Sequence, residues 1–189
     1  MAKKRKCGVL LPISSLPSKY GIGCFDKKAY EFVDALKAAG QSYWQILPLG
    51  PTSYGDSPYQ SFSTFAGNPY FISLEELIKE GVLTKKECDS VDFGDNEASV
   101  DYAKLYEGRM ILLRKAYERS NIYMDPEFRK FQEEEAWWLK DYALFMAVKK
   151  AQPTVWLHNR LIPNQSTASS PPIAGQCRYP LALLYHKRT

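Results

Sequence analysis

A chain of 189 residues with 45% hydrophobic residues can bury a sizeable core, as one ordinary domain or as part of a larger one. The net charge is only +4, and all of it belongs to residues 153–189, because residues 1–152 carry 21 basic and 21 acidic groups. This neutral body argues against nucleic acid as a partner, although a basic-tailed nucleic-acid binder is a remote alternative. No segment is long enough to span a membrane, so no membrane partner is expected.

The cysteines and histidines indicate neither a structural zinc site nor a disulfide framework. The four cysteines form no CxxC pair, and both histidines lie after residue 152. Four cysteines in a chain of this length favour a reducing compartment, so we expect a cytoplasmic protein.

Residues 7–13 form a continuous apolar run followed by turn residues, which predicts a short buried strand. A helix follows, with Asp26 as its N-terminal cap and Gly40 at its end. Residues 43–49 predict a second strand with Trp44 in the core. The apolar face of the helix, which we expect to be buried, comprises Ala29, Phe32, Val33, Leu36 and Ala39.

Strand, helix and strand within about 45 residues make a βαβ unit, which implies parallel strands. The fold class predicted for residues 1–72 is therefore α/β. Both strands lead into long loops at their C-terminal ends, the edge where ligand sites gather in such folds.

From residue 73 the pattern changes to helices. Residues 73–76 and 84–87 have the spacing of capping boxes, and Asp125 followed by Pro126 is a further helix start. Longer helices are expected at residues 101–119 and 136–150. The expected buried side chains of these two helices are Leu105, Tyr106, Leu112, Leu113, Ala116 and Tyr117 in the first, and Trp138, Tyr142, Leu144, Phe145 and Val148 in the second.

No third strand of the series is visible, so residues 73–152 predict a helical insertion subdomain after the second strand. From residue 153 the periodicity collapses, prolines recur and residues 165–170 are low in complexity, so we expect residues 153–189 to be a disordered tail. The predicted organisation is thus 1–72, 73–152 and 153–189.

The loop of residues 50–70 interleaves aromatic rings with hydroxyl groups, and Asp56 is its only charged residue. That mixture suits a neutral ligand whose sugar rings have an apolar face and a rim of hydroxyls, whereas phosphate or nucleic acid would call for Lys and Arg. The loop therefore predicts a sugar-binding site.

Four residues of this loop are candidate substrate contacts. The Tyr59 ring can stack on a sugar and donate a hydrogen bond, or it can pack the loop onto the body. Asp56 and Ser57 can bind sugar hydroxyls, or they can hold the turn through local backbone bonds. Tyr54, beside Gly55 at the loop tip, is a candidate outer sugar contact.

No catalytic residue is predicted. Glycosyl chemistry with retention of configuration needs two carboxylates about 5–5.5 Å apart. The strand ends offer only Asp26, which is expected to be a helix cap, and Asp56. No Ser-His-Asp arrangement is evident.

Several motifs resemble the start of the 4-alpha-glucanotransferase family, the amylomaltases or disproportionating enzymes. They lie at residues 8–17, 21–23, 44–52 and 141–147, and above all at residues 54–70, YGDSPYQSFSTFAGNPY. The resemblance covers roughly residues 6–152, and the tail does not share it.

The resemblance implies an incomplete (β/α)₈ TIM barrel, of which this chain holds the first βαβ unit plus a helical insertion. It implies transfer of α-1,4-glucan segments between maltooligosaccharides through a covalent glycosyl-enzyme, with no cofactor. Tyr59 matches the tyrosine that stacks near the cleaved bond, with Ser57 beside it, and Tyr54 matches an outer glucan contact that Tyr102 can join.

The family's three catalytic carboxylates lie in later strands. A complete barrel takes about 250 residues. The expected function is therefore a truncated 4-alpha-glucanotransferase that is inactive alone, and the alternative is a non-catalytic α-glucan-binding fragment.

Overall fold

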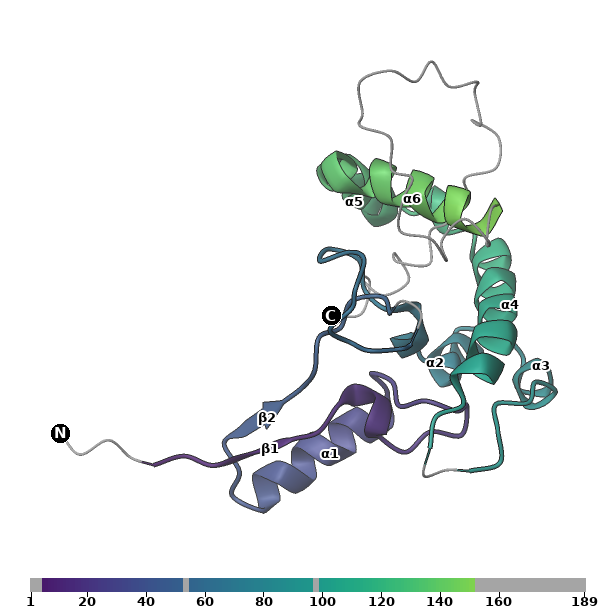
Figure 1. Cartoon of the computed structure of the whole chain (residues 1–189). Coiled ribbons are helices and arrows are strands. Elements are labelled where there is room, and N and C mark those ends of the chain that lie inside the picture. Colours follow the sequence, from purple (N-terminus) through teal and green to yellow (C-terminus); the bar gives the residue numbers. More distant parts are fainter. Residues whose placement is uncertain (1–4, 53–54, 97–98, 152–189) are drawn as a thin grey trace. The chain divides into compact units, whose positions relative to one another are not determined.

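The computed structural model describes residues 5–52, 55–96 and 99–151. One compact unit ends at Ile122 and a second begins at Tyr123. Helices α1 to α4 belong to the first unit together with both strands, so the expected boundary at residue 72 falls inside it (Figure 1). The three-part organisation stays a prediction, and the predicted tail lies outside the described residues.

The first unit begins with the predicted βαβ unit. Strand β1 (Gly8–Leu10), helix α1 (Lys27–Ala38) and strand β2 (Tyr43–Gln45) follow in order, and the strands pair in parallel with Gly8 opposite Tyr43. Each strand has three residues and is shorter than predicted. The ladder continues one residue beyond β1, because the Leu11 N–H donates to the Gln45 carbonyl at 3.0 Å. The Leu11 carbonyl then accepts from the Trp44 indole N–H.

Helix α1 begins and ends where the sequence predicts. The backbone N–H of Lys28 donates to Oδ1 of Asp26 at 2.8 Å, and Gly40 has a φ of +71°. The Phe32 ring meets the Trp44 ring edge-on with centroids 5.0 Å apart, and the Trp44 indole N–H donates to the Leu11 carbonyl at 2.9 Å. These contacts hold α1 and the segment after β1 against β2.

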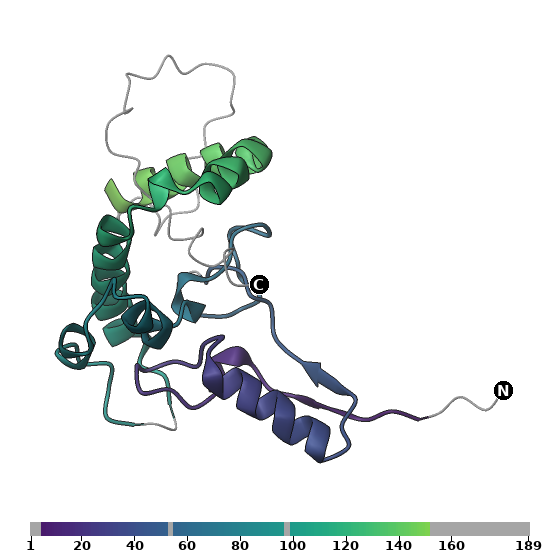
Figure 2. The same cartoon turned by 180° about the vertical axis from the view of Figure 1, so that it is seen from behind.

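The predicted burial of this region was wrong for several side chains. In β1, Val9 and Leu10 are exposed, the latter to 55%. In α1, Val33 is 46% exposed, and Ala39, which caps the helix at its C-terminal end, is also exposed. Seen from both sides, α1 runs alongside the strand pair (Figures 1 and 2). Two short strands cover only a narrow stripe of the helix, and among the described residues no third strand pairs with them. The rest of the apolar surface therefore faces solvent.

The core of the first unit lies among its later helices. After two short 3₁₀ turns, η1 (Ile13–Ser15) and η2 (Pro69–Phe71), come α2 (Leu74–Lys79), α3 (Lys85–Asp89) and α4 (Tyr102–Ser120). Of the side chains expected to be buried in α4, Tyr106 is exposed and Tyr117 is half-buried. The largest of the almost fully buried side chains are Ile13, Leu74, Leu77, Leu83, Cys88, Leu105, Arg109, Leu112 and Leu113.

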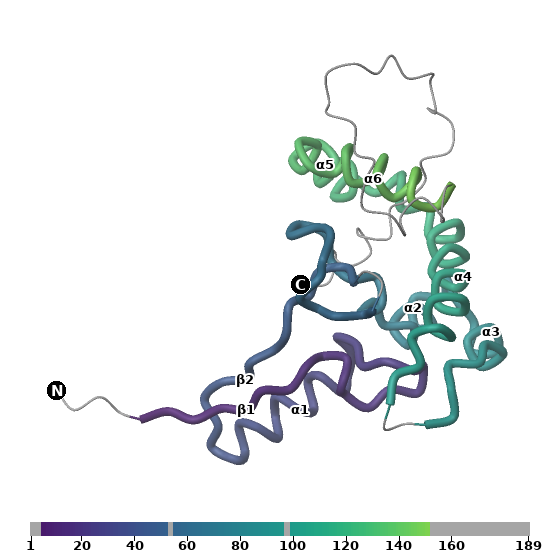
Figure 3. The backbone as a smooth tube through the Cα atoms, viewed as in Figure 1, coloured from purple at the N-terminus to yellow at the C-terminus, as the bar shows by residue number. Residues whose placement is uncertain are grey.

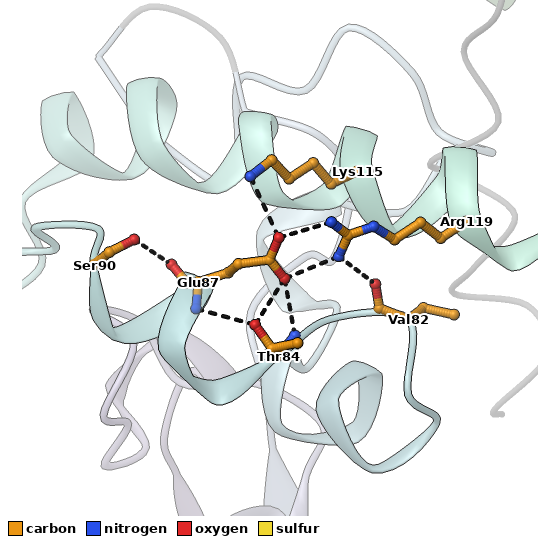
Figure 4. Close-up of polar contacts among 6 residues, drawn as sticks. All are labelled: Val82, Thr84, Glu87, Ser90, Lys115 and Arg119. Carbon is orange, nitrogen blue, oxygen red and sulfur yellow. Dashed lines mark hydrogen bonds and ion pairs between the residues drawn. The ribbon is translucent and has the colours of Figure 1, made fainter.

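Local capping signals were reliable in this helical part. Ser73 accepts from the N–H of Glu76 at 3.2 Å, and Thr84 and Glu87 form the complete reciprocal capping box. Figure 4 shows that the same Glu87 carboxylate also binds α4. It accepts from Nη1 and Nη2 of Arg119 and from the ammonium of Lys115. One carboxylate thus caps α3 and ties it to α4.

The described part of the second unit, up to residue 151, contains a helix pair. After the 3₁₀ turn η3 (Ile122–Met124), α5 (Pro126–Glu134) and α6 (Ala136–Ala151) follow one another and contact each other. Asp125 caps α5 as predicted, by accepting from the N–H of Glu127 at 2.9 Å. Trp138 is buried as predicted, but Leu144 and Val148 are exposed, because α5 covers only one face of α6 within the described residues. Within the described ranges no helix has the length and apolarity needed to cross a membrane.

The bonds of Glu87 to Thr84, Lys115 and Arg119 predict that the free energy of unfolding falls at acid pH. Hydrogen bonds from Arg119 and Thr84 lower the pKa of Glu87 in the folded state. The stabilisation of the folded state by the ionised Glu87 is therefore fully present above the unfolded-state pKa near 4.3. It is lost as the pH falls towards the lower folded-state pKa. We expect Glu87→Gln to lower the urea midpoint at pH 7 and the difference from the parent to shrink below about pH 4.

The matched control is Glu107→Gln, which removes the same charge from an exposed position on α4. A difference between parent and Glu87→Gln that stays constant down to pH 3 would contradict this account.

Candidate functional site

An open pocket lies where the chain leaves both strands. Residues 12–14 after β1 and residues 47–49 after β2 line it, and its volume is about 390 Å³ including the solvent at its mouth. The other lining residues are Ile22, Thr52, Asp56, Pro58, Asn68, Phe71 and Tyr102. Its position is the C-terminal edge of the parallel strands, which is where the sequence predicts a ligand site.

Hydrogen bonds close the long loop at its base. The backbone N–H of Asn68 donates to the Leu49 carbonyl at 2.8 Å, so the loop returns to the end of the segment that follows β2 (Figure 3). The buried Asn68 side chain accepts from the N–H of Tyr70 at 3.0 Å and starts η2. Inside the loop, a Cβ on Gly50 would lie 2.4 Å from the Ser61 hydroxyl, so a larger residue there would force Ser61 to shift.

Asp56 lies in the pocket wall, as a sugar-binding role requires. Its φ of +55° follows the φ of +93° at Gly55, a left-handed turn that aspartate tolerates better than most residues. Burial raises the pKa of Asp56 above its ordinary value. The loop thus holds the only carboxylate among the described residues that line the pocket.

The Asp56 carboxylate affects the pKa of two phenols, Tyr70 and Tyr102. Burial chiefly, and the Asp56 charge next, raise the pKa of Tyr70 to about 12 and also raise the pKa of Tyr102. The two rings lie 6.3 Å apart, and Tyr102, the first residue of α4, lines the pocket. Helix α4 therefore contributes a ring and a hydroxyl group to the lining of the pocket.

Ser57 and Tyr59 lie beside the pocket rather than in its lining. The Ser57 hydroxyl accepts from the N–H of Tyr59 at 3.4 Å, and the Ser57 carbonyl accepts from the N–H of Gln60 at 3.1 Å, so Ser57 does hold the turn. The Tyr59 ring is 73% exposed, so it does not pack the loop onto the body. Their roles as substrate contacts stay predictions, and Tyr54 lies outside the described residues.

Sequence reasoning missed Asn68 and reached Tyr102 only through the family resemblance. A signal for Asn68 was present, because an asparagine followed by a proline commonly starts a helical turn. Nothing in the local pattern around Tyr102 placed it at the strand ends.

The chemistry of the pocket is that of a neutral, hydroxyl-rich ligand. Its described lining offers hydroxyl groups of Ser14, Thr52 and Tyr102, the amide of Asn68 and one carboxylate, with apolar surface between them and no Lys or Arg. Asp56 has no second carboxylate in this lining with which to form an acid/base pair. Among the described residues no group of three or more His, Cys, Asp or Glu side chains could hold a metal ion.

Comparison with known proteins identifies a family that this chain matches. Residues 11–174 match the family described as 4-alpha-glucanotransferase. The 4-alpha-glucanotransferase of Clostridium butyricum is 58% identical over 137 residues, which is 72% of this chain and 28% of that protein. Its counterpart in Streptococcus pneumoniae is 53% identical over 149 residues, which is 78% of this chain and 30% of that protein.

The fold is similar to that of a solved amylomaltase from Streptococcus agalactiae in complex with acarbose, with a TM-score of 0.72 and 44% identity over 78% of this chain and 30% of that one. The chain thus spans about 30% of the length of the relatives it matches. The family match runs to residue 174, and the predicted tail of residues 153–189 stays a prediction.

The coupling between Asp56 and Tyr102 can be measured directly. We expect Asp56→Asn to lower the pKa of the Tyr102 phenol towards its ordinary value of 10.0, because the nearby negative charge that opposes phenolate formation is gone. An NMR titration of ring-labelled tyrosine reads this pKa. Asp34→Asn, at an exposed position on α1, should leave it unchanged, and an equal response to both substitutions would contradict the described pocket.

Proposed function

This chain belongs to the 4-alpha-glucanotransferase family, and we propose that it carries the first part of that family's substrate-binding site. The observation that carries the proposal is the neutral pocket at the C-terminal ends of two parallel strands, walled by Asp56 and Tyr102. The proposed ligands are α-1,4-glucans and maltooligosaccharides. The similar amylomaltase in complex with acarbose supports this ligand class.

Within this proposal, the pocket lining and the loop beside it make different contacts with the glucan. Ser14, Thr52, Asn68 and the Asp56 carboxylate offer hydrogen bonds to sugar hydroxyls, while the apolar lining meets the ring faces. The exposed ring of Tyr59 is free to stack on a sugar that extends out of the pocket, with Ser57 fixing the turn that presents it. Tyr54 is proposed as an outer contact.

We infer that β1, α1 and β2 are the first βαβ unit of a (β/α)₈ barrel. The parallel pairing, the site at the C-terminal edge and the similarity to amylomaltase support this assignment. The exposed apolar side chains of β1 and α1, such as Leu10 and Val33, are what a partly assembled barrel presents. The helices that follow β2 are proposed as an insertion into it.

The family reaction proposed for the whole protein is transfer of α-1,4-glucan segments between maltooligosaccharides by a retaining mechanism, without a cofactor. Retention needs a nucleophile and an acid/base about 5–5.5 Å apart. The described pocket lining contains only the Asp56 carboxylate, so this chain alone is proposed to be inactive in glucan transfer. A non-catalytic glucan-binding fragment is the alternative, and the exposed Tyr59 ring favours it.

We propose the cytoplasm as the site of action. Cys7, Cys24 and Cys88 are free thiols, and Cys24 and Cys88 are buried. Free cysteines are typical of proteins that work in a reducing compartment.

Incubation with maltotriose tests the proposed inactivity. We expect chromatography to show maltotriose unchanged after incubation with this chain, because its pocket lacks a carboxylate pair. The full-length Clostridium butyricum relative serves as the positive control. A ladder of longer maltooligosaccharides formed by this chain would refute the inactivity.

Amylose binding tests the role of the loop. We expect Tyr59→Ala to weaken binding by about tenfold, since an aromatic stacking contact is worth about 0.5–1.5 kcal/mol beyond its burial. Tyr30→Ala is the matched control, because Tyr30 on α1 is 71% exposed, close to the 73% of Tyr59, and lies away from the pocket lining. Affinity electrophoresis in amylose gels measures both variants. Equal retardation of parent and Tyr59→Ala would argue against the proposed contact.

A further inference from the structure

Arg109 on α4 is a charged side chain with no exposed surface. Its Nη1 donates to the Tyr20 carbonyl at 3.1 Å, and its Nη2 donates to the Ile72 carbonyl at 2.5 Å and to Sγ of Cys24 at 3.0 Å. Its Nε has no hydrogen-bond partner among the described residues. A buried guanidinium is expensive, and this one bonds only to two carbonyls and a thiol that burial keeps protonated by raising its pKa.

The acceptors of Arg109 belong to the segments that wall the pocket. Tyr20 and Cys24 lie on the segment after β1 that contributes Ser14 and Ile22 to the lining. The Gly23 N–H donates to the Ser14 carbonyl at 3.2 Å, so this segment is folded back on itself.

The other two walls are the end of the long loop, which bonds to the same guanidinium, and helix α4, which carries it. Ile72 directly follows Phe71, a lining residue at the end of the long loop, and Arg109 itself lies on the helix whose first residue, Tyr102, also lines the pocket. The Cys24 thiol lies 3.5 Å from the Tyr70 carbonyl and joins the first two segments as well. One planar group outside the lining therefore bonds two walls to the third.

We propose that Arg109 is a positioning residue, which holds the three walls of the pocket in the geometry that binds glucan without touching the glucan itself. The planar guanidinium has donors in several fixed directions, whereas a lysine nitrogen is a single point and an apolar side chain makes no such bond. A purely apolar contact would bury α4 at lower cost but would leave the separation of the walls unspecified. The proposal rests on the proposed function, since it assumes that the pocket binds glucan.

The test uses Arg109→Lys and Arg109→Met in the full chain. We expect the affinity for maltoheptaose, measured by calorimetry, to fall by about tenfold in Arg109→Met and by less in Arg109→Lys. Arg119→Met is the matched control, because it removes an arginine from the same helix whose bonds go to Glu87 and Val82, away from the pocket lining. It should leave the affinity unchanged.

A second readout separates positioning from general stability. In a folded Arg109 variant, Asp56→Asn should no longer lower the pKa of the Tyr102 phenol, because the two walls no longer hold these groups at their native separation. In the Arg119→Met background the effect of Asp56→Asn should persist. A folded Arg109→Met variant with full affinity and an intact response to Asp56→Asn would overturn the proposal.

A measurement on the unaltered chain decides the matter if neither variant folds. In subdenaturing urea, the backbone amides of Gly23, Phe71 and Leu105, one from each wall segment, should open to hydrogen exchange together. Separate openings would overturn the proposal. If the unaltered chain fails to bind maltoheptaose, the proposed function fails, while the Tyr102 titration and the exchange data still decide the role of Arg109.

Discussion

The parallel pairing of β1 with β2 is the constraint on which the rest of the structure depends. With Gly8 opposite Tyr43 and Leu10 opposite Gln45, the chain leaves both strands at the same edge. An antiparallel pair would send the two following segments to opposite ends. Because the pairing is parallel, residues 12–14 and 47–49 meet, and the space between them becomes the pocket.

Around that edge, two buried polar side chains help to shape the pocket. The Asn68 side chain accepts from the N–H of Tyr70, and the Arg109 guanidinium donates to the carbonyls of Tyr20 and Ile72. Such groups are costly to bury, so each specifies one arrangement through the bonds that it must keep. The apolar core lies instead among α2, α3 and α4, while apolar side chains of β1 and α1 remain exposed. That division agrees with a chain that spans about 30% of the length of its relatives.

Sequence-based expectations succeeded where the physical cause is local and failed where it is not. Asp26, Thr84 and Asp125 cap their helices as predicted, because a cap needs only a side chain and a backbone N–H two or three residues away. The burial expected for Leu10, Val33 and Leu144 was wrong. Burial depends on which other elements cover a face, and an apolar pattern alone does not show whether a covering element is present.

The amino-acid sequence by itself determined the helix starts, the βαβ order, the neutral hydroxyl-rich and aromatic character of the long loop, and the family resemblance. Only the tertiary structure decided that Asp56 and Tyr102 share a pocket, that the Tyr59 ring is exposed and that Arg109 is buried. The reason is distance along the chain. Arg109 and Tyr20 are 89 residues apart, and no local periodicity encodes which distant carbonyl a buried guanidinium will meet.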